Sequence, residues 1–151
     1  MRETIASWEG YTRSLLRIIL AFTFSLHGYR HLFGFFHVTS GRRATIPMAI
    51  DALPAMFGSL EILGGALLFL GLLTRPVAAL LSLELVAAYL YAALPRGPWP
   101  IRNGGNEVLL YLLVFLYLAV AGGGIWSIDH LIANRTNRSR SEIPAGTPVR
   151  T

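Results

Sequence analysis

The sequence predicts an all-α integral membrane protein, an antiparallel bundle of four helices joined by short loops. Of its 151 residues, 54% are hydrophobic and 14% are charged, and the mean hydropathy is +0.53. Four apolar stretches recur along the chain, close to the roughly 20 residues that a bilayer-spanning helix needs. The second contains the pair Gly64-Gly65. In water each glycine would cost a helix about 1 kcal/mol relative to alanine, whereas in a bilayer it lets a neighbouring helix approach closely.

Composition excludes several classes of chemistry. The chain has no cysteine, which rules out a thiol relay, a disulfide framework, an iron–sulfur cluster and a thiolate zinc site within it. Its thirteen basic residues are all arginine and give a net charge of +5. No basic patch interleaved with aromatic residues is present, so we expect no nucleic-acid partner. The exclusive use of arginine is typical of a GC-rich bacterial genome, and the expected location is the bacterial inner membrane.

The first span is expected over residues 14–36 and is the least hydrophobic of the four, since Arg17 and several later polar residues interrupt it. The later ones lie on one helical face, which therefore should not meet lipid. That stripe consists of Thr23, His27, Arg30, His31 and Gly34. The following connection, residues 38–53, is too apolar for a solvated loop and is expected to form an interfacial turn or a short half-helix.

The second span is expected over residues 55–73. Glu61 shares one helical face with Gly64 and Gly65, since these positions are spaced at i, i+3 and i+4. The sequence therefore predicts a tightly packed helix whose carboxylate turns inward, toward a partner helix.

The third span is expected over residues 77–94, and only a tight turn at residues 74–76 separates it from the second, so the two must be antiparallel neighbours. The proline- and glycine-rich segment 95–106 should contain no helix. The fourth span is expected over residues 107–126. Together residues 1–129 would form one membrane domain, and the polar residues 130–151 a disordered cytoplasmic tail.

Counting along the helices places polar groups from all four spans in the same outer half of the bundle. Arg30 and Glu61 fall at similar depth, and we expect a buried ion pair between them, either purely structural or also orienting a ligand. His27 and His31 have a spacing that can hold a metal, but two ligands do not complete a site, so no metal is predicted. The candidate ligand-binding residues are His27, Arg30, His31, Glu61, Tyr91 and Glu107.

Glu84 falls near the expected bilayer midplane, apart from the other polar groups. Two interpretations stay open for it. It could carry protons, or it could hydrogen-bond to a tyrosine or threonine within the bundle.

Five motifs occur in order from the first span to Asp129, over about three quarters of the chain. They are His27-Gly28-Tyr29-Arg30-His31-Leu32-Phe33-Gly34, Glu61-Ile62-Leu63-Gly64-Gly65, Gly71-Leu72-Leu73-Thr74-Arg75, Asn103-Gly104-Gly105-Asn106-Glu107 and Gly124-Ile125-Trp126-Ser127-Ile128-Asp129. Together these motifs resemble the DoxX family of small four-helix bacterial membrane proteins. Two departures are visible. Arg30 stands where the family usually has lysine, and the third span differs from many relatives in having Glu84 and in having Ala93-Leu94 where they have a histidine.

The resemblance implies association with a membrane redox system, because family relatives are named as a subunit of a thiosulfate:quinone oxidoreductase. We therefore expect a membrane subunit that docks a redox partner and offers a quinone-sized site in its outer half, rather than a complete enzyme. A small-solute transporter or channel and a ligand-free assembly scaffold are the alternatives. The oligomeric state stays open, a homo-oligomer included.

The first testable prediction concerns topology. Arginines are more frequent in the termini and the 74–76 turn than in the two opposite loops, so positive-inside bias places both termini in the cytoplasm. Single variants Thr39→Cys, Gly97→Cys and Thr147→Cys report the three regions to an impermeant thiol reagent. Intact cells should be labelled at positions 39 and 97 and protected at position 147; the reverse pattern would invert the topology.

Overall fold

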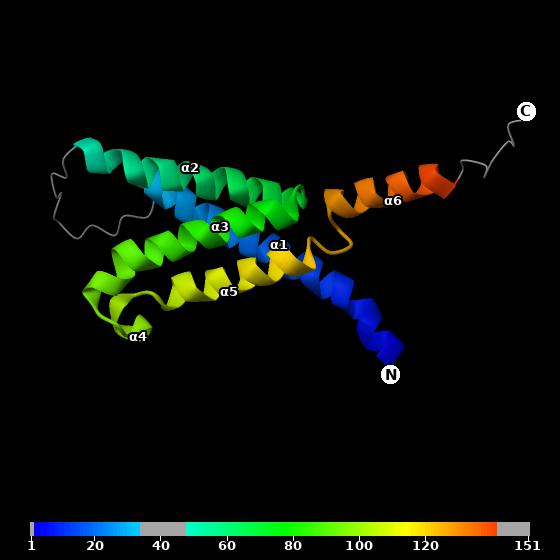
Figure 1. Ribbon diagram of the computed structural model, residues 1–151, viewed down its shortest axis with the longest axis horizontal. Helices are drawn as coiled ribbons and strands as arrows, with labels where there is room; N and C mark the ends of the chain where they lie inside the picture. The colour runs from blue at the N-terminus through cyan, green and yellow to red at the C-terminus, as the bar shows by residue number, and fades with distance from the viewer. Residues whose placement is uncertain (1, 34–47, 142–151) are drawn as a thin grey trace, which may run out of the picture.

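The computed structural model describes residues 2–33 and 48–141, and within them every regular element is a helix. The prediction of an all-α chain is confirmed. Figure 1 shows the helices along the chain. The elements are α1 (Arg2–Phe33), α2 (Met48–Leu70), α3 (Thr74–Ala88) with a π-helical turn η1 (Tyr89–Ala93) and a 3-10 turn η2 (Leu94–Arg96), α4 (Pro100–Asn103), α5 (Asn106–Ala121) and α6 (Ile128–Ser141).

The first two helices begin earlier than the apolar spans predicted from the sequence. α1 begins at Arg2, before the apolar stretch, and an ion pair between Glu9 and Arg13 at 2.5 Å supports this polar first part. Pairs spaced at i and i+4 stabilise a helix surface. α2 begins at Met48 and continues through Pro54. The part of the predicted 38–53 connection before Met48 lies outside the described residues.

The glycines of α2 allow close helix packing, as the sequence predicts. A side-chain carbon built on Gly65 would lie 2.1 Å from Ser25 Oγ of α1, and one on Gly64 would lie 2.9 Å from Leu81 of α3. At Gly28 the added carbon would lie 2.7 Å from the backbone oxygen of Gly58. The backbone of α2 therefore packs directly against α1 and α3. A larger residue at these glycines would push the helices apart.

A short helix occupies part of the segment that the sequence predicts to be non-helical. α4 begins with Pro100 at its first turn, has no side-chain cap, and ends at Gly104 with a left-handed φ of 76°. The prediction was wrong because a proline costs little at the first helical position, where its missing N–H would have no partner anyway. Upstream, η1 is a π-helical turn just before Pro95, a common way to accommodate a disturbed hydrogen-bond ladder.

The last predicted span ends early, and the predicted tail is partly helical. α5 ends at Ala121 instead of residue 126, since Gly122 adopts a φ of 82° that favours glycine. After the 122–127 loop the chain forms α6, through Ser141. The expectation of disorder from residue 130 is therefore wrong as far as Ser141, and residues 142–151 lie outside the described part.

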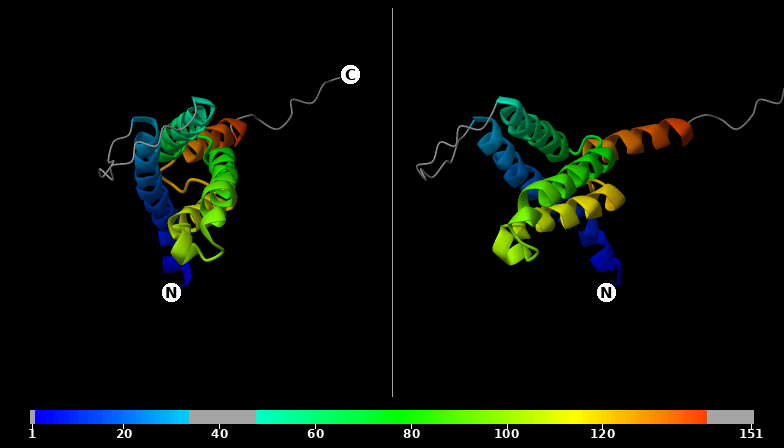
Figure 2. Two further views of the ribbon diagram at one scale, coloured as in Figure 1. Left: turned by 90° about the vertical axis from the view of Figure 1, so that its left-hand side faces the viewer. Right: turned by 60° about the vertical axis from the view of Figure 1, so that its left-hand side comes forward.

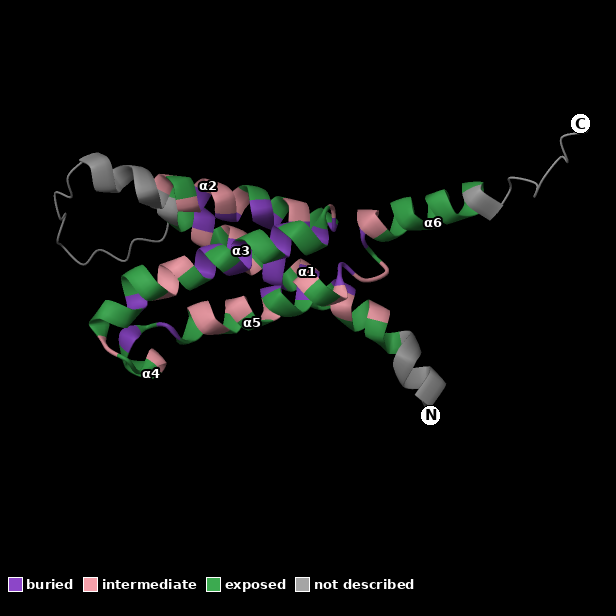
Figure 3. Cartoon of the chain, viewed as in Figure 1, coloured by how far each residue is buried: buried purple, intermediate pink, exposed green. Residues whose placement is uncertain are grey.

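A single hydrophobic core joins the four long helices. Viewed from one end, these helices stand around a common centre (Figure 2), and Figure 3 shows buried residues gathered between them. Phe24 from α1, Leu68 from α2, Leu81 from α3 and Phe115 from α5 are almost fully buried. The outward faces remain apolar, with large side chains such as Leu83 exposed.

One described helical stretch is long and apolar enough to cross a bilayer. It runs from Thr74 to Arg96, 23 residues with a mean hydropathy of 2.0. Ala55–Leu70 and Asn106–Ala121 are apolar helices shorter than this length. Of the four predicted spans, the third is therefore the one that meets the length and composition of a membrane-crossing helix among the described residues.

At one end of the bundle a fully buried arginine of α1 holds the helices together. Arg17 donates from Nε to the carbonyl of Gly123 at 2.9 Å and from Nη1 to those of Leu68 and Phe69 at the end of α2. Its Nη2 donates to Trp126 at 2.7 Å. Carbonyls in the last turn of a helix lack partners within the helix, and a cation there also meets the negative end of the helix dipole. Arg17 thus binds α1, α2 and the 122–127 loop together.

A carboxylate completes the same junction. Asp129 accepts hydrogen bonds from the backbone N–H groups of Leu73 and Thr74, both at 2.8 Å, at the start of α3. Its own N–H donates to Gly71 at 2.9 Å. Leu73 has a left-handed φ of 51°, a conformation that is uncommon for a non-glycine residue. We call Arg17, Asp129 and the carbonyls and N–H groups that they bind the junction.

The junction yields a stability prediction. Arg17→Met would leave the carbonyls of Phe69, Gly123 and Trp126 without this donor, whereas that of Leu68 keeps the N–H of Gly71. Each unsatisfied buried group costs about 1–3 kcal/mol, so we expect at least about 3 kcal/mol of destabilisation in a reversible unfolding assay in detergent. Arg102→Met is the matched control, because Arg102 is exposed on α4. Equal losses in the two variants would show that Arg17 does not hold the helices together.

Candidate functional site

The residues predicted to bind a ligand meet most clearly in a cavity between α1 and α5. It has a volume of about 410 Å³, within the usual range for sites that hold small molecules. His27 and Arg30 reach it from the second half of α1, and Glu107 from the start of α5. We call this the α1–α5 cavity. Its lining residues are Thr23, Leu26, His27, Arg30, Glu107 and Tyr111.

The α1–α5 cavity contains an ion-pairing contact between a histidine and a carboxylate. His27 Nε2 lies 3.2 Å from Glu107 Oε1, with 27% of the histidine side chain and 63% of the glutamate side chain exposed. His27 Nδ1 lies 3.4 Å from the carbonyl oxygen of Thr23. Both ring nitrogens therefore face acceptors, so a proton on either one has a partner inside the protein.

Aromatic rings form the inner wall beside His27. Its ring meets Tyr111 edge-on, with centroids 5.4 Å apart and an interplanar angle of 77°. Phe24 stacks near His27 at 6.3 Å and contacts Phe115 edge-on at 4.8 Å. These packed rings restrict the motion of the imidazole. The sequence predicts Tyr111 only as a packing or interfacial residue; its spacing of four from Glu107 is the signal that puts the two on one face.

The folded turn before α5 brings Glu107 to His27. Asn103 is buried, and its side-chain Nδ2 donates to the carbonyl of Gly97 at 2.7 Å, while its side-chain Oδ1 accepts the N–H of Gly105 at 2.8 Å. A side-chain carbon on Gly105 would lie 2.5 Å from the ring of Tyr89. The turn therefore requires a glycine here, and it starts α5 with Glu107 in its first turn, where a carboxylate is favoured by the helix dipole.

The ion pair predicted between Arg30 and Glu61 does not form. Arg30 is exposed and lines the α1–α5 cavity, whereas Glu61 is buried with 6% of its surface exposed. The physical reason is helical geometry. Gly28 contacts α2, and a position two residues further along a helix points about 200° away. Arg30 and Glu61 were expected at the same depth along their helices, but their side chains point in different directions.

Glu61 lies opposite Glu84 in the α2–α3 hairpin. Contact between Gly64 and Leu81 fixes the antiparallel register, which sets positions 61 and 84 side by side one turn further along. The two carboxyls are close enough to interact electrostatically. Glu84 is buried, and neither of its oxygens has a hydrogen-bond partner among the described residues. The expected hydrogen bond from a tyrosine or threonine is therefore not made.

Of the two remaining candidates, Tyr91 does not line the α1–α5 cavity. Tyr91 is 86% exposed, because it belongs to the π-helical turn where the helix changes its winding. The side chain of His31 lies outside the described residues. No group of three or more metal-ligating side chains occurs among residues that the structure describes.

The fold and these residues define a class: an all-α protein with a long apolar helix and a polar cavity between two helices. The sequence profile of the DoxX family matches residues 12–94, more than half of the chain. This chain belongs to the DoxX family. The match ends before the two later motifs, at residues 103–107 and 124–129.

Two of three individual relatives match more of the chain than the family profile does. An uncharacterized protein of Haemophilus influenzae is 37% identical over 133 residues, 85% of this chain and 96% of that protein. CatD of Bacillus subtilis, provisionally named as an oxidoreductase, is 28% identical over 123 residues, 78% of this chain and 84% of that protein. An uncharacterized membrane protein of Mycobacterium tuberculosis is 32% identical over 88 residues, 52% of this chain and 54% of that protein. No solved structure matches the chain significantly. The family and the mycobacterial relative support a membrane location.

The site geometry predicts which charges are energetically coupled. In a double-mutant cycle His27→Leu and Glu107→Gln should deviate from additivity by about 0.5 kcal/mol or more, since contacting pairs couple. Arg30→Met and Glu61→Gln should be additive, because those side chains lie on different faces. Thermal or chemical unfolding measures both cycles. Coupling only in the second cycle would restore the ion pair that the sequence predicts and contradict the structure.

Proposed function

We propose that this protein is a membrane-spanning subunit of a redox system and holds a quinone in the α1–α5 cavity for a partner oxidoreductase. The observation that carries the proposal is the group of polar side chains around that cavity: the cation Arg30, the His27–Glu107 contact and the hydroxyl of Tyr111. The oxidoreductase name of CatD supports a redox association.

Exposed apolar surface supports a multi-pass arrangement. Large aliphatic and aromatic side chains cover the outward faces of the long helices, beyond what soluble proteins usually expose as a continuous patch. We propose that α1, α2, α3 with its continuation and α5 all cross the bacterial inner membrane, with both termini cytoplasmic. Examples on the four helices are Phe22, Leu63, Leu83 and Leu113.

The α1–α5 cavity suits a ligand with carbonyl groups. Arg30 makes no hydrogen bond or ion pair with another described residue, so its guanidinium can donate to a quinone oxygen. Tyr111 offers a hydroxyl, and Leu26 contributes apolar surface. A quinone fits these residues because its carbonyls accept hydrogen bonds from the polar side chains. Its ring can contact Leu26 while its tail remains in lipid.

Proton supply is the second role proposed for the α1–α5 cavity. Reduction of a quinone to a quinol takes up two electrons and two protons. In this scheme the partner oxidoreductase provides the electrons, since no residue group described here can hold a redox metal and the chain contains no thiol. In this scheme His27 delivers the two protons one at a time to the quinone oxygens. After each transfer Glu107, whose side chain is 63% exposed, takes a proton from water and passes it to His27 across the 3.2 Å contact.

A binding experiment tests this function. Calorimetry with the purified protein and a short-chain quinone should show saturable binding, weakened about tenfold or more by Arg30→Met, which removes a charge-assisted hydrogen bond. His27→Leu should weaken it as well. Tyr91→Leu is the matched control, because Tyr91 lies outside the cavity.

Two results would discard the quinone site. Equal affinity in the wild type, Arg30→Met and His27→Leu would show that the ligand binds elsewhere. Absence of saturable binding would favour a ligand-free scaffold, whereas solute flux in liposomes without quinone binding would favour a transporter or channel.

A further inference from the structure

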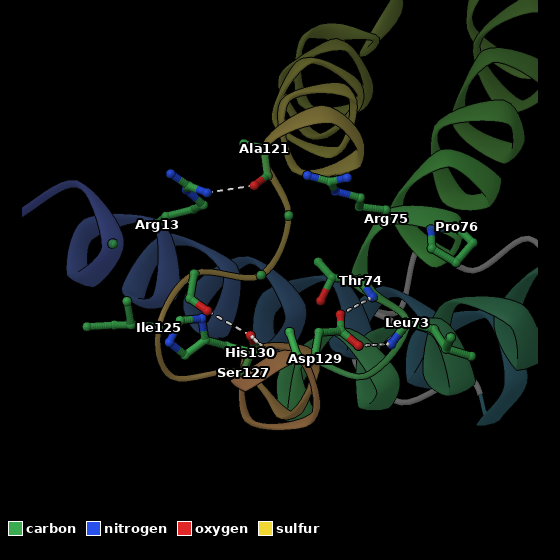
Figure 4. A pocket seen from close by; sticks show the side chains of 15 residues that line it. Arg13, Leu73, Thr74, Arg75, Pro76, Ala121, Ile125, Ser127, Asp129 and His130 are labelled. Atoms are coloured by element: carbon green, nitrogen blue, oxygen red, sulfur yellow. Dashed lines mark hydrogen bonds between the residues drawn. The ribbon is translucent and has the colours of Figure 1, made fainter. Parts of the chain in front are cut away.

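A second cavity lies at the other end of the molecule, where α3 begins and α5 ends. It has a volume of about 550 Å³ and is bounded by the 122–127 loop (Figure 4). α1 contributes Arg13, α3 contributes Thr74 and Arg75, and α6 contributes His130. We call it the junction cavity, since Asp129 of the junction forms part of its wall.

Several hydrogen-bond donors of the junction cavity have no partner within residues 2–33 and 48–141. Thr74 is fully buried, and its Oγ1 makes no hydrogen bond; it points toward Gly123, where an added side-chain carbon would lie only 2.7 Å away. Arg13 Nε is likewise buried and unpartnered. Arg75 makes no hydrogen bond or ion pair with another described residue, and its Nε would lie 3.4 Å from a side-chain carbon on Gly122.

The acceptors around the same cavity are already occupied. Asp129 receives two backbone N–H groups at the start of α3. The carbonyl of Ala121 accepts from Arg13 at 2.6 Å, that of Gly123 from Arg17 at 2.9 Å, and that of Gly124 from Ser127 at 2.7 Å. Glu9, the other nearby acid, pairs with Arg13 at 2.5 Å. The junction cavity therefore has an excess of donors over acceptors.

We propose that the junction cavity binds a phosphate group, with Arg75 as its principal cation and the Thr74 hydroxyl and Arg13 Nε as additional donors. A phosphate has only acceptor oxygens and a negative charge, so it complements a site with surplus N–H and O–H groups. An arginine guanidinium matches phosphate geometry better than an ammonium does.

The surroundings favour a phospholipid headgroup as the source of that phosphate. Trp8, Tyr11 and Trp126 gather at this end of the molecule, with Tyr11 and Trp126 in edge-on contact at 5.5 Å. Such aromatic residues are enriched at membrane–water interfaces. Leu80 and Val120, on the two helices that bound the cavity, are exposed and offer apolar surface for acyl chains.

The test compares three probes with the purified protein: phosphatidylglycerol, diacylglycerol with the same chains but no phosphate, and inorganic phosphate. Binding is measured by native mass spectrometry and by the shift in melting temperature. Arg75→Gln should weaken phosphatidylglycerol about tenfold or more, since it removes a charge-assisted contact. Thr74→Val tests the buried hydroxyl independently. Arg102→Gln is the control, at the opposite end of the molecule.

The three probes separate the outcomes. Binding of phosphatidylglycerol that depends on Arg75, with weaker diacylglycerol binding, supports a lipid headgroup site. Binding of inorganic phosphate that depends on Arg75 supports a site for a soluble phosphate compound. Equal affinity of Arg75→Gln and wild type for both phosphate probes would overturn the proposal, and so would diacylglycerol binding as tight as that of phosphatidylglycerol.

Discussion

The contact between Arg17 and four backbone carbonyls is the interaction on which the rest of the structure depends. A fully buried guanidinium is costly unless its donors are satisfied, and here the end of α2 and the 122–127 loop satisfy them. The same contacts supply the unpaired carbonyls at the end of α2 with donors. These contacts therefore satisfy both the guanidinium and the carbonyls, and they fix α1 against the turn that leads into α3.

The junction explains the residues found at Gly71 and Asp129 in this chain. A side-chain carbon on Gly71 would lie 2.9 Å from the guanidinium carbon of Arg17 and 2.5 Å from Ser127, so only glycine fits. Asp129 occupies the start of α3, where its two oxygens accept the N–H groups of Leu73 and Thr74. These residues hold the junction together, which leaves the opposite end of the helices to carry the α1–α5 cavity.

Helical periodicity predicts the fold better than it predicts the site. The glycine pair of α2 and the four apolar stretches correctly indicate close-packed helices, because those signals depend on local spacing. Arg30 and Glu61 were expected to pair because their depths agree. Depth along an axis does not determine the direction in which a side chain points, and that direction is set by the contact of Gly28 with α2. The long-range approach of Glu107 to His27 depends on the folded turn at Asn103, which sequence spacing alone does not reveal.

Photolabelling with an azidoquinone tests the central claim, that the junction closes one end of the molecule and leaves a ligand site between α1 and α5 at the other. After illumination and proteolysis, mass spectrometry identifies the labelled peptides. The account predicts label in residues 23–30 and 107–111, suppressed by excess unlabelled quinone. Competable label around Glu61 and Glu84 instead, or label that excess quinone does not suppress, would contradict it.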